Sequence, residues 1–252
     1  MTEQIKKYYE NYDEDGRLFR DKAHLPENLT TIRYFDRLFE PGSRILDACA
    51  GTGRYSFYLA DKGHKVTACD LVEHHVNTIK AKSDAHKLED TAVCNVLDLS
   101  QFEDNCFDVV LCMGAMYHLS SDDEKERAIR ECARVCRPGG LVVLSYMNYF
   151  AALAASLDTG LGNLDEELNA MEDESDILWK ATTPTKMERY VKKVGLEMLH
   201  NIGADGISFI LADKVNAATD EIFDKWMEYI YKNCEEPSIV GYSMHGLLIG
   251  RK

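Results

Sequence analysis

Short apolar segments alternate with amphipathic stretches from residue 44 onward. Five early segments have the length and apolar content of strands: Ile45–Ala48, Lys65–Asp70, Thr91–Asn95, Phe107–Met113 and Leu141–Tyr146. Apolar residues at helical spacing fill the intervals, as in residues 53–61 and 73–87. Strands that alternate with helices of this length predict parallel β-α-β units, and hence a doubly wound α/β fold.

Polar residues at helix ends mark where the later elements begin and stop. Ser121 and Glu124 form a capping-box pattern, and Pro138-Gly139-Gly140 predicts the stop of the helix that follows. Thr183-Pro184 predicts another helix start, and Gly195 its end. Three further elements complete the prediction of a mostly parallel, seven-stranded sheet: a strand at Leu196–Ile202, a helix at 214–232 and a strand at Ser243–Ile249.

Two segments fall outside the alternation, and we expect residues 1–252 to form a single domain that includes them. Residues 1–40 are predicted to be a helical N-terminal cap, with helices at 3–12 and at Pro26–Phe39. Residues 148–182 are acidic and favour helix, and an excursion of that length after a strand is typical of a lid over a binding site. Its acidity is typical of a solvated face; if it selects substrates, it favours a cationic or neutral one.

The charge argues against a nucleic-acid substrate. Asp and Glu outnumber Lys and Arg by 43 to 29, which gives a net charge of −14, and no dense basic cluster stands out along the chain. Such a field repels phosphate backbones. The uninterrupted apolar stretches are too short for a membrane span, and the N-terminus lacks the apolar core of a secretory signal. We therefore expect a soluble, cytoplasmic protein.

The eight cysteines are interpreted as small buried hydrophobic residues in a reducing compartment. None forms a Cys-x-x-Cys pair, and several lie within apolar runs. Cys132 and Cys136 are four residues apart on a predicted helix, but two thiolates without a second pair do not make a zinc site. No metal site is predicted.

A glycine-containing loop carries the clearest chemical signal. The strand at residues 45–48 leads through Cys49-Ala50 into Gly51-Thr52-Gly53, and a helix follows. Gly51 and Gly53 permit a sharp turn and a close backbone approach to a ligand, and the helix start favours an anionic group. Asp70 ends the second strand, seventeen residues after Gly53, where its carboxylate can accept hydrogen bonds from a ribose diol. Together these features predict an adenosine-containing cofactor.

The loop fits S-adenosylmethionine (SAM) better than a dinucleotide. The dinucleotide fingerprint needs a third glycine at position 56, which is Ser56. Asp47 would sit poorly beside a pyrophosphate but suits a ligand with an amino group, which the methionine end of SAM has. An NAD-dependent oxidoreductase is the weaker alternative for these reasons.

At this point the sequence resembles class I SAM-dependent methyltransferases, especially bacterial enzymes that act on small molecules. Four motifs in order carry the resemblance: Leu46–Gly53, Asp70, Phe107–Val110 and Arg137–Gly140. The resemblance is firm over residues 40–147 and implies SAM as the cofactor. It implies one cofactor-binding set, namely Asp47, Cys49, Gly51, Gly53, Asp70, Leu71, Asn95, Val96 and Met113.

The resemblance also implies a role for each part of that set. Asp47 and the glycine loop would hold the methionine portion, Asp70 the ribose hydroxyls, and Asn95 with Val96 the adenine. Cys49 replaces the glycine that is usual in the family, and Asn95 replaces the usual Asp. An amide oxygen can still accept a hydrogen bond from the adenine amine.

Candidate catalytic residues follow the fourth strand, at Tyr117 and His118. Methyl transfer from a sulfonium needs alignment above all, and a general base only when the acceptor arrives protonated. A chemical role for either residue and a structural role both stay open, and whether His245 faces the pocket or solvent is undecided. Three N-terminal tyrosines could close over the cofactor or pack on the core: Tyr8, Tyr9 and Tyr12.

Small-molecule methylation is the leading functional hypothesis. The segment after the fourth strand lacks the Asn/Asp-Pro-Pro-aromatic motif that is common in methyltransferases acting on nucleic-acid bases. An RNA or protein methyltransferase and a SAM-binding protein without transfer activity are the alternatives.

Overall fold

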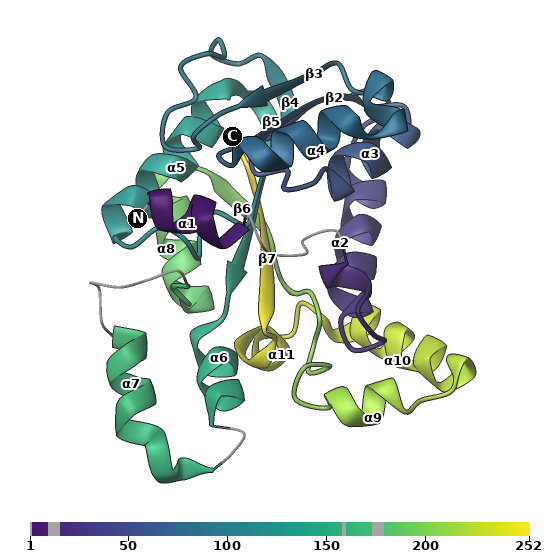
Figure 1. The fold of residues 1–252 in the computed structure, drawn as a ribbon, viewed down its shortest axis with the longest axis vertical. Coiled ribbons are helices and arrows are strands. Elements are labelled where there is room, and N and C mark those ends of the chain that lie inside the picture. Colours follow the sequence, from purple (N-terminus) through teal and green to yellow (C-terminus); the bar gives the residue numbers. More distant parts are fainter. Residues whose placement is uncertain (1, 10–15, 158–159, 173–178) are drawn as a thin grey trace.

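A computed structural model describes residues 2–9, 16–157, 160–172 and 179–252 of the protein, and its centre is one mixed sheet (Figure 1). The strands are β1 (Arg44–Asp47), β2 (Lys65–Asp70), β3 (Asp90–Val93), β4 (Phe107–Met113), β5 (Cys136–Met147), β6 (Glu197–Gly203) and β7 (His245–Arg251). Their order is β3-β2-β1-β4-β5-β7-β6, and among these strands β7 alone runs opposite to the rest. The predicted doubly wound, mostly parallel seven-stranded sheet is confirmed.

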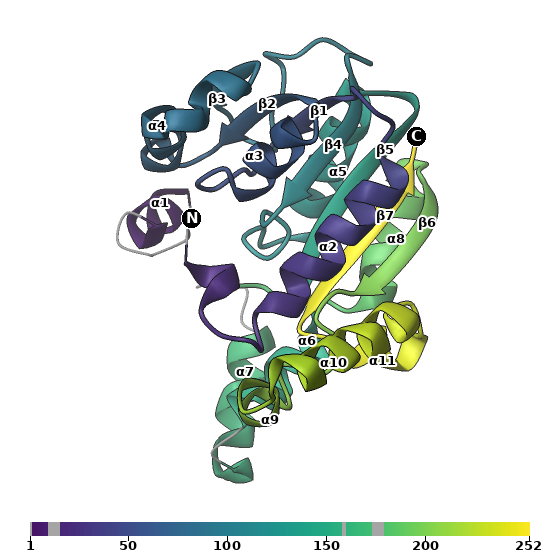
Figure 2. The ribbon, with the colours of Figure 1, turned by 90° about the vertical axis from the view of Figure 1, so that its right-hand side faces the viewer.

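Helices cover both faces of this sheet (Figures 1 and 2). The α-helices are α1 (Thr2–Tyr9), α2 (Leu25–Leu38), α3 (Arg54–Asp61), α4 (Glu73–Ala81), α5 (Asp122–Val135), α6 (Tyr149–Ser156), α7 (Leu164–Glu172), α8 (Pro184–Val194), α9 (Ala212–Asn216), α10 (Asp220–Asn233) and α11 (Pro237–Tyr242). Three short 3₁₀ helices accompany them: η1 (Arg17–Phe19), η2 (Ser83–Lys87) and η3 (Leu161–Asn163). Within the described ranges, no helix is long and apolar enough to cross a membrane.

The central strand β4 shows how the core is divided. Val109 and Leu111 pack with apolar residues of α2, α3 and α10 on one face of the sheet. Val110 and Cys112 pack with α5 and α8 on the other face. Because both faces are covered, the strand is a continuous apolar run rather than an alternating one.

Local capping signals are confirmed at two helix starts. Ser121 and Glu124 form the reciprocal capping box at the start of α5, and the Thr183 hydroxyl accepts a hydrogen bond from the Lys186 amide at the start of α8. Gly195 ends α8 in the left-handed conformation, at φ 90°. These contacts are local in sequence, which is why the pattern alone could locate them.

Three predicted boundaries were wrong. The helix expected over 73–87 ends at Ala81 and continues as the separate 3₁₀ turn η2. The helix expected over 214–232 is two helices, since the Thr219 hydroxyl caps a new helix by accepting from the Ile222 amide. Finally, α5 ends at Val135, and Pro138–Gly140 belong to β5 instead of stopping the helix. A Cβ on Gly140 would lie 2.6 Å from the Asp108 carbonyl oxygen, so close contact with β4 explains that glycine.

The acidic segment at 148–182 leaves the sheet after β5. Its described part consists of α6, η3 and α7, which project beyond the end of the sheet where β7 begins (Figures 1 and 2). The segment rejoins the body at Trp179, and the Thr182 amide donates a hydrogen bond to the Met147 carbonyl. A covering role for this segment stays a prediction.

Candidate active site

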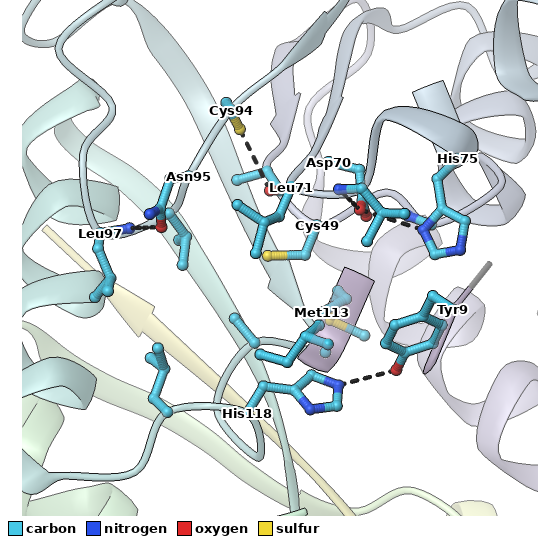
Figure 3. A pocket seen from close by; sticks show the side chains of 18 of the residues that line it. Tyr9, Cys49, Asp70, Leu71, His75, Cys94, Asn95, Leu97, Met113 and His118 are labelled. Carbon is cyan, nitrogen blue, oxygen red and sulfur yellow. Dashed lines mark hydrogen bonds and ion pairs between the residues drawn. The ribbon is translucent and has the colours of Figure 1, made fainter. Parts of the chain in front are cut away.

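A pocket lies where β1, β2 and β4 end, and α1 borders it (Figure 3). Most of the predicted site residues line it: Cys49, Gly51, Asp70, Leu71, Asn95, Val96, Met113, Tyr117 and His118. Asp47 and Gly53 do not line it. The carboxyl edge of a parallel sheet is where open α/β folds bind their ligands.

The loop between β1 and α3 has the backbone that the glycines were predicted to permit. Gly51 and Gly53 have φ of 53° and 91°, in the region that L side chains rarely adopt. A Cβ on Gly53 would lie 2.8 Å from the Phe57 ring. Gly53 therefore shapes the turn as the residue before α3, while Gly51 forms part of the pocket wall.

Asp70 is held rigidly at the pocket wall by three donors. Its carboxylate accepts hydrogen bonds of 2.8 Å from the Gly51 amide and 2.8 Å from the Val72 amide, and its Oδ1 lies 3.2 Å from Nδ1 of His75. The first of these bonds ties the end of β2 directly to the glycine loop. Asp70 is 8% exposed, which leaves part of the carboxylate facing the pocket.

His75 is a pocket residue that the sequence interpretation missed. It lies on α4, is 3% exposed, and its Nε2 is buried without a hydrogen-bond partner in the described residues. Figure 3 shows it beside Asp70, with the Tyr9 ring below it. The pair His74-His75 follows Asp70 closely in sequence, but only the helix orientation decides which of the two enters the pocket.

Asp47 lies beneath the glycine loop rather than in the pocket wall. It is 1% exposed, its Oδ2 accepts a 2.7 Å hydrogen bond from the Ser56 hydroxyl, and its Oδ1 is buried without a partner in the described part of the chain. Burial, together with the nearby charge of Asp70, raises the pKa of Asp47 to about 7. Ser56, the residue that breaks the dinucleotide glycine pattern, thus positions this carboxylate.

Asn95 borders the opposite end of the pocket from His75 (Figure 3). Its Oδ1 accepts a 2.9 Å hydrogen bond from the Leu97 amide, which holds the turn after β3. Cys49 lines the pocket, and its hydrogen bond with Cys112, reinforced by burial, raises the pKa of its thiol well above the ordinary value. Cys49 is therefore a neutral, small side chain at the position where the family that this sequence resembles usually has glycine.

An aromatic cluster lies where α1 borders the pocket, and Tyr9, Tyr117 and His118 of this cluster line it. The Tyr9 hydroxyl lies 2.9 Å from Nε2 of His118, and Tyr9 also contacts the His75 ring edge-on at 5.2 Å. Trp179 stacks on Tyr117 at 5.3 Å and lies 4.9 Å from the His118 ring. Tyr8 meets Trp179 edge-on at 5.6 Å. Residues about 170 positions apart in sequence therefore meet here, and of the three N-terminal tyrosines, Tyr12 lies outside the described residues.

His245 lies at the same sheet edge, two strands away from β4. It pairs with Met147 of β5 in the strand register. Its Nδ1 lies 2.9 Å from Oδ2 of Asp205 and 3.4 Å from Oε2 of Glu27. His245 is partly exposed and does not belong to the pocket described above.

Comparison with known proteins agrees with this geometry. Residues 46–144 match a family model described as a methyltransferase domain. A ubiquinone biosynthesis O-methyltransferase of Xanthomonas campestris is 34% identical over 113 residues, which are 44% of this chain and 46% of that protein. The alignment thus spans about half the length of the curated relative.

Solved structures extend the similarity across most of the fold. A SAM-dependent methyltransferase of Methanosarcina mazei has a TM-score of 0.58 and 18% identity, covering 87% of this chain and 96% of its own. A protein of Pyrococcus horikoshii has a TM-score of 0.62 and 15% identity, covering 97% and 98%. The family model thus assigns a methyltransferase domain to residues 46–144, and the solved structures share the fold over most of the chain.

Proposed function

We propose that this chain transfers the methyl group of SAM to a small-molecule acceptor by in-line displacement. The observation that carries the proposal is a single pocket at the sheet edge. It joins the Gly51–Asp70 contact to Tyr117 and His118, so a cofactor and an acceptor can meet inside one enclosure. Alignment and exclusion of water within such an enclosure supply most of the acceleration that this reaction needs.

The residues present fit the cofactor that the family implies. When bound, SAM supplies an electrophilic methyl group on a sulfonium. In our proposal Asp70 accepts hydrogen bonds from the ribose hydroxyls, and Asn95 with Leu71 and Val96 surrounds the adenine. Asp47 attracts the amino group of the methionine portion from beneath the loop. Its buried Oδ1, which has no hydrogen-bond partner among the residues that the structure describes, supports this role.

On the acceptor side, we assign the proton transfer to His118. Tyr9 holds the ring by a 2.9 Å hydrogen bond at Nε2, so the imidazole has a fixed orientation at the pocket. His118 would take the proton of an acceptor that arrives protonated, and Tyr9 would stabilise the charge that results. The rings of Tyr9, Tyr117 and Trp179 exclude water and favour a cationic group beside them.

In our proposal a small acceptor fits this partly aromatic pocket better than a polymer does. The Xanthomonas relative is an O-methyltransferase by name, but the family match covers residues 46–144 and omits the N-terminal cap and the 148–182 segment. Those two segments contribute Tyr9, which lines the pocket, and Trp179, which stacks on Tyr117, so in our proposal the acceptor need not be that of the relative. The eight free thiols support a reducing, cytoplasmic location.

Two measurements test the proposal. Calorimetry should detect binding of SAM and none of NAD. The protein is then incubated with SAM carrying a labelled methyl group, together with separate pools of small molecules, RNA and protein. Label in the small-molecule pool supports the proposal. Label confined to RNA or protein, or SAM binding without label in any pool, would contradict it.

A further inference from the structure

His75 is buried in the wall of the cofactor pocket, where it contacts side chains from two other parts of the chain. It lies in the first turn of α4. Its Nδ1 lies 3.2 Å from Oδ1 of Asp70, and its ring meets the Tyr9 ring edge-on at 5.2 Å (Figure 3). His75 therefore connects the end of β2 with the N-terminal helix α1.

The hydrogen bonding of this ring is unusual for a buried residue. Nε2 has no hydrogen-bond partner among the residues that the structure describes, so the contact with Asp70 is the one hydrogen bond of the His75 side chain there. Burying a polar group without a partner costs free energy, which a leucine or phenylalanine at this position would avoid. Packing alone therefore does not explain a histidine at position 75.

The contact with Asp70 assigns a hydrogen of the ring to Nδ1. An ionised carboxylate only accepts hydrogen bonds, so the nitrogen that faces Oδ1 must carry a hydrogen. In a neutral imidazole, Nε2 then holds the lone pair. His75 is thus a third donor to Asp70, besides the amides of Gly51 and Val72.

This third donor matters because the carboxylate is nearly enclosed. Asp70 is 8% exposed, so water compensates little of its charge. Oδ1 accepts from the Val72 amide and from His75, while Oδ2 accepts from the Gly51 amide. These hydrogen bonds compensate part of the buried charge and fix the direction of the lone pairs that remain.

We propose that His75 is a positioning residue that makes the cofactor site selective for ribose. It acts through Asp70, because its Nδ1–H holds Oδ1 while the remaining lone pairs of the carboxylate are directed at the sugar hydroxyls. The ligand class that this pair selects is an adenosine with its ribose hydroxyls, over the same molecule with a deoxygenated sugar. The inference rests on the proposed function, in which Asp70 binds the ribose of SAM.

Calorimetry without methyl transfer tests this role. The ligands are S-adenosylhomocysteine, which is SAM without the transferred methyl group, and an analogue that also lacks both ribose hydroxyls. The wild-type protein should bind the first at least about tenfold more tightly than the second. His75→Phe keeps a ring beside Tyr9 but removes the donor, and it should reduce that preference at least about fivefold.

His75→Asn is the rescue variant, because it loses the ring but places an amide donor near the position of Nδ1. Its preference should stay within about twofold of wild type. A structural role of the ring predicts the opposite order, in which Phe is tolerated and Asn is not. His74→Phe is the matched control, since His74 is an exposed residue of the same helix that does not line the pocket, and it should keep the wild-type preference.

The outcomes separate this inference from the proposed function. A wild-type protein that binds neither compound, or binds both equally, contradicts the assignment of Asp70 to the ribose, and the role of His75 falls with it. A wild-type preference that persists in His75→Phe, or that is lost equally in His75→Phe and His75→Asn, overturns the role of His75 alone. Nitrogen-15 NMR of the wild-type imidazoles adds a test that needs no folded variant: His75 should carry a hydrogen at Nδ1, and an Nδ1 without one would also overturn the role.

Discussion

Replacement of Asp70 by alanine is the most direct test of how the protein binds the ribose of SAM. The carboxylate accepts hydrogen bonds from the Gly51 and Val72 amides and contacts His75, and we assign the ribose hydroxyls to the same group. Asp70→Ala removes the carboxylate that takes part in all of these contacts. Both SAM affinity and folding stability should therefore fall, and the two effects must be separated.

The expected loss of affinity follows from the strength of charge-assisted hydrogen bonds. One such bond contributes about 1.5–3 kcal/mol, and each 1.4 kcal/mol corresponds to about tenfold in affinity. Loss of the ribose contact should therefore weaken SAM binding at least about tenfold. The two loop amides that lose their acceptor should also lower the free energy of unfolding by about 1–3 kcal/mol each.

Asp108→Ala is the matched control for this experiment. Asp108 also accepts a hydrogen bond from a backbone amide, that of Arg44, and pairs with the Arg137 guanidinium. It lies near the start of β4, at the opposite edge of the sheet from the pocket. This variant should lose stability and keep the wild-type dissociation constant for SAM.

Calorimetry with SAM and urea denaturation measure the two quantities on each variant. A folded Asp70→Ala protein that binds SAM with unchanged affinity would refute the ribose assignment. A comparable loss of SAM affinity in Asp108→Ala would show that general destabilisation, rather than the lost contact, explains the effect.

Three further predictions concern the surroundings of the pocket. The pKa of buried Asp47 is raised, so between about pH 4 and 7 the folded state keeps a proton that the unfolded chain releases. The free energy of unfolding should therefore fall as pH rises through that window. Urea denaturation of Asp47→Asn at several pH values should show a weaker dependence of this free energy on pH. Tyr9→Phe removes the hydroxyl that holds His118 but keeps the ring, so initial rates should fall about tenfold or more while SAM affinity holds; an unchanged rate would argue against this pair. Trp179→Ala removes the ring stacked on Tyr117, which should weaken SAM binding by about 0.5–1.5 kcal/mol in calorimetry; unchanged affinity would exclude a closing role for the tryptophan.

Much of the fold was determined by patterns that are local in the sequence. The strand segments, the capping box at Ser121 and the start of α8 at Thr183 all lie where apolar spacing and cap residues predicted them. The loop at Gly51 and Gly53, together with Asp70 at the end of β2, indicated the cofactor pocket. These signals are readable because each depends on residues within about one turn or one β-α unit.

Only the tertiary structure decided which distant side chains meet. His118 contacts Tyr9 from the N-terminal helix and Trp179 from the far end of the insertion, and neither contact has a local signature. The sequence pattern also gave no sign that His75, rather than His74, contacts Asp70. Contacts of this kind depend on strand order and helix packing, because the folded sheet sets the distance between segments that the chain keeps far apart.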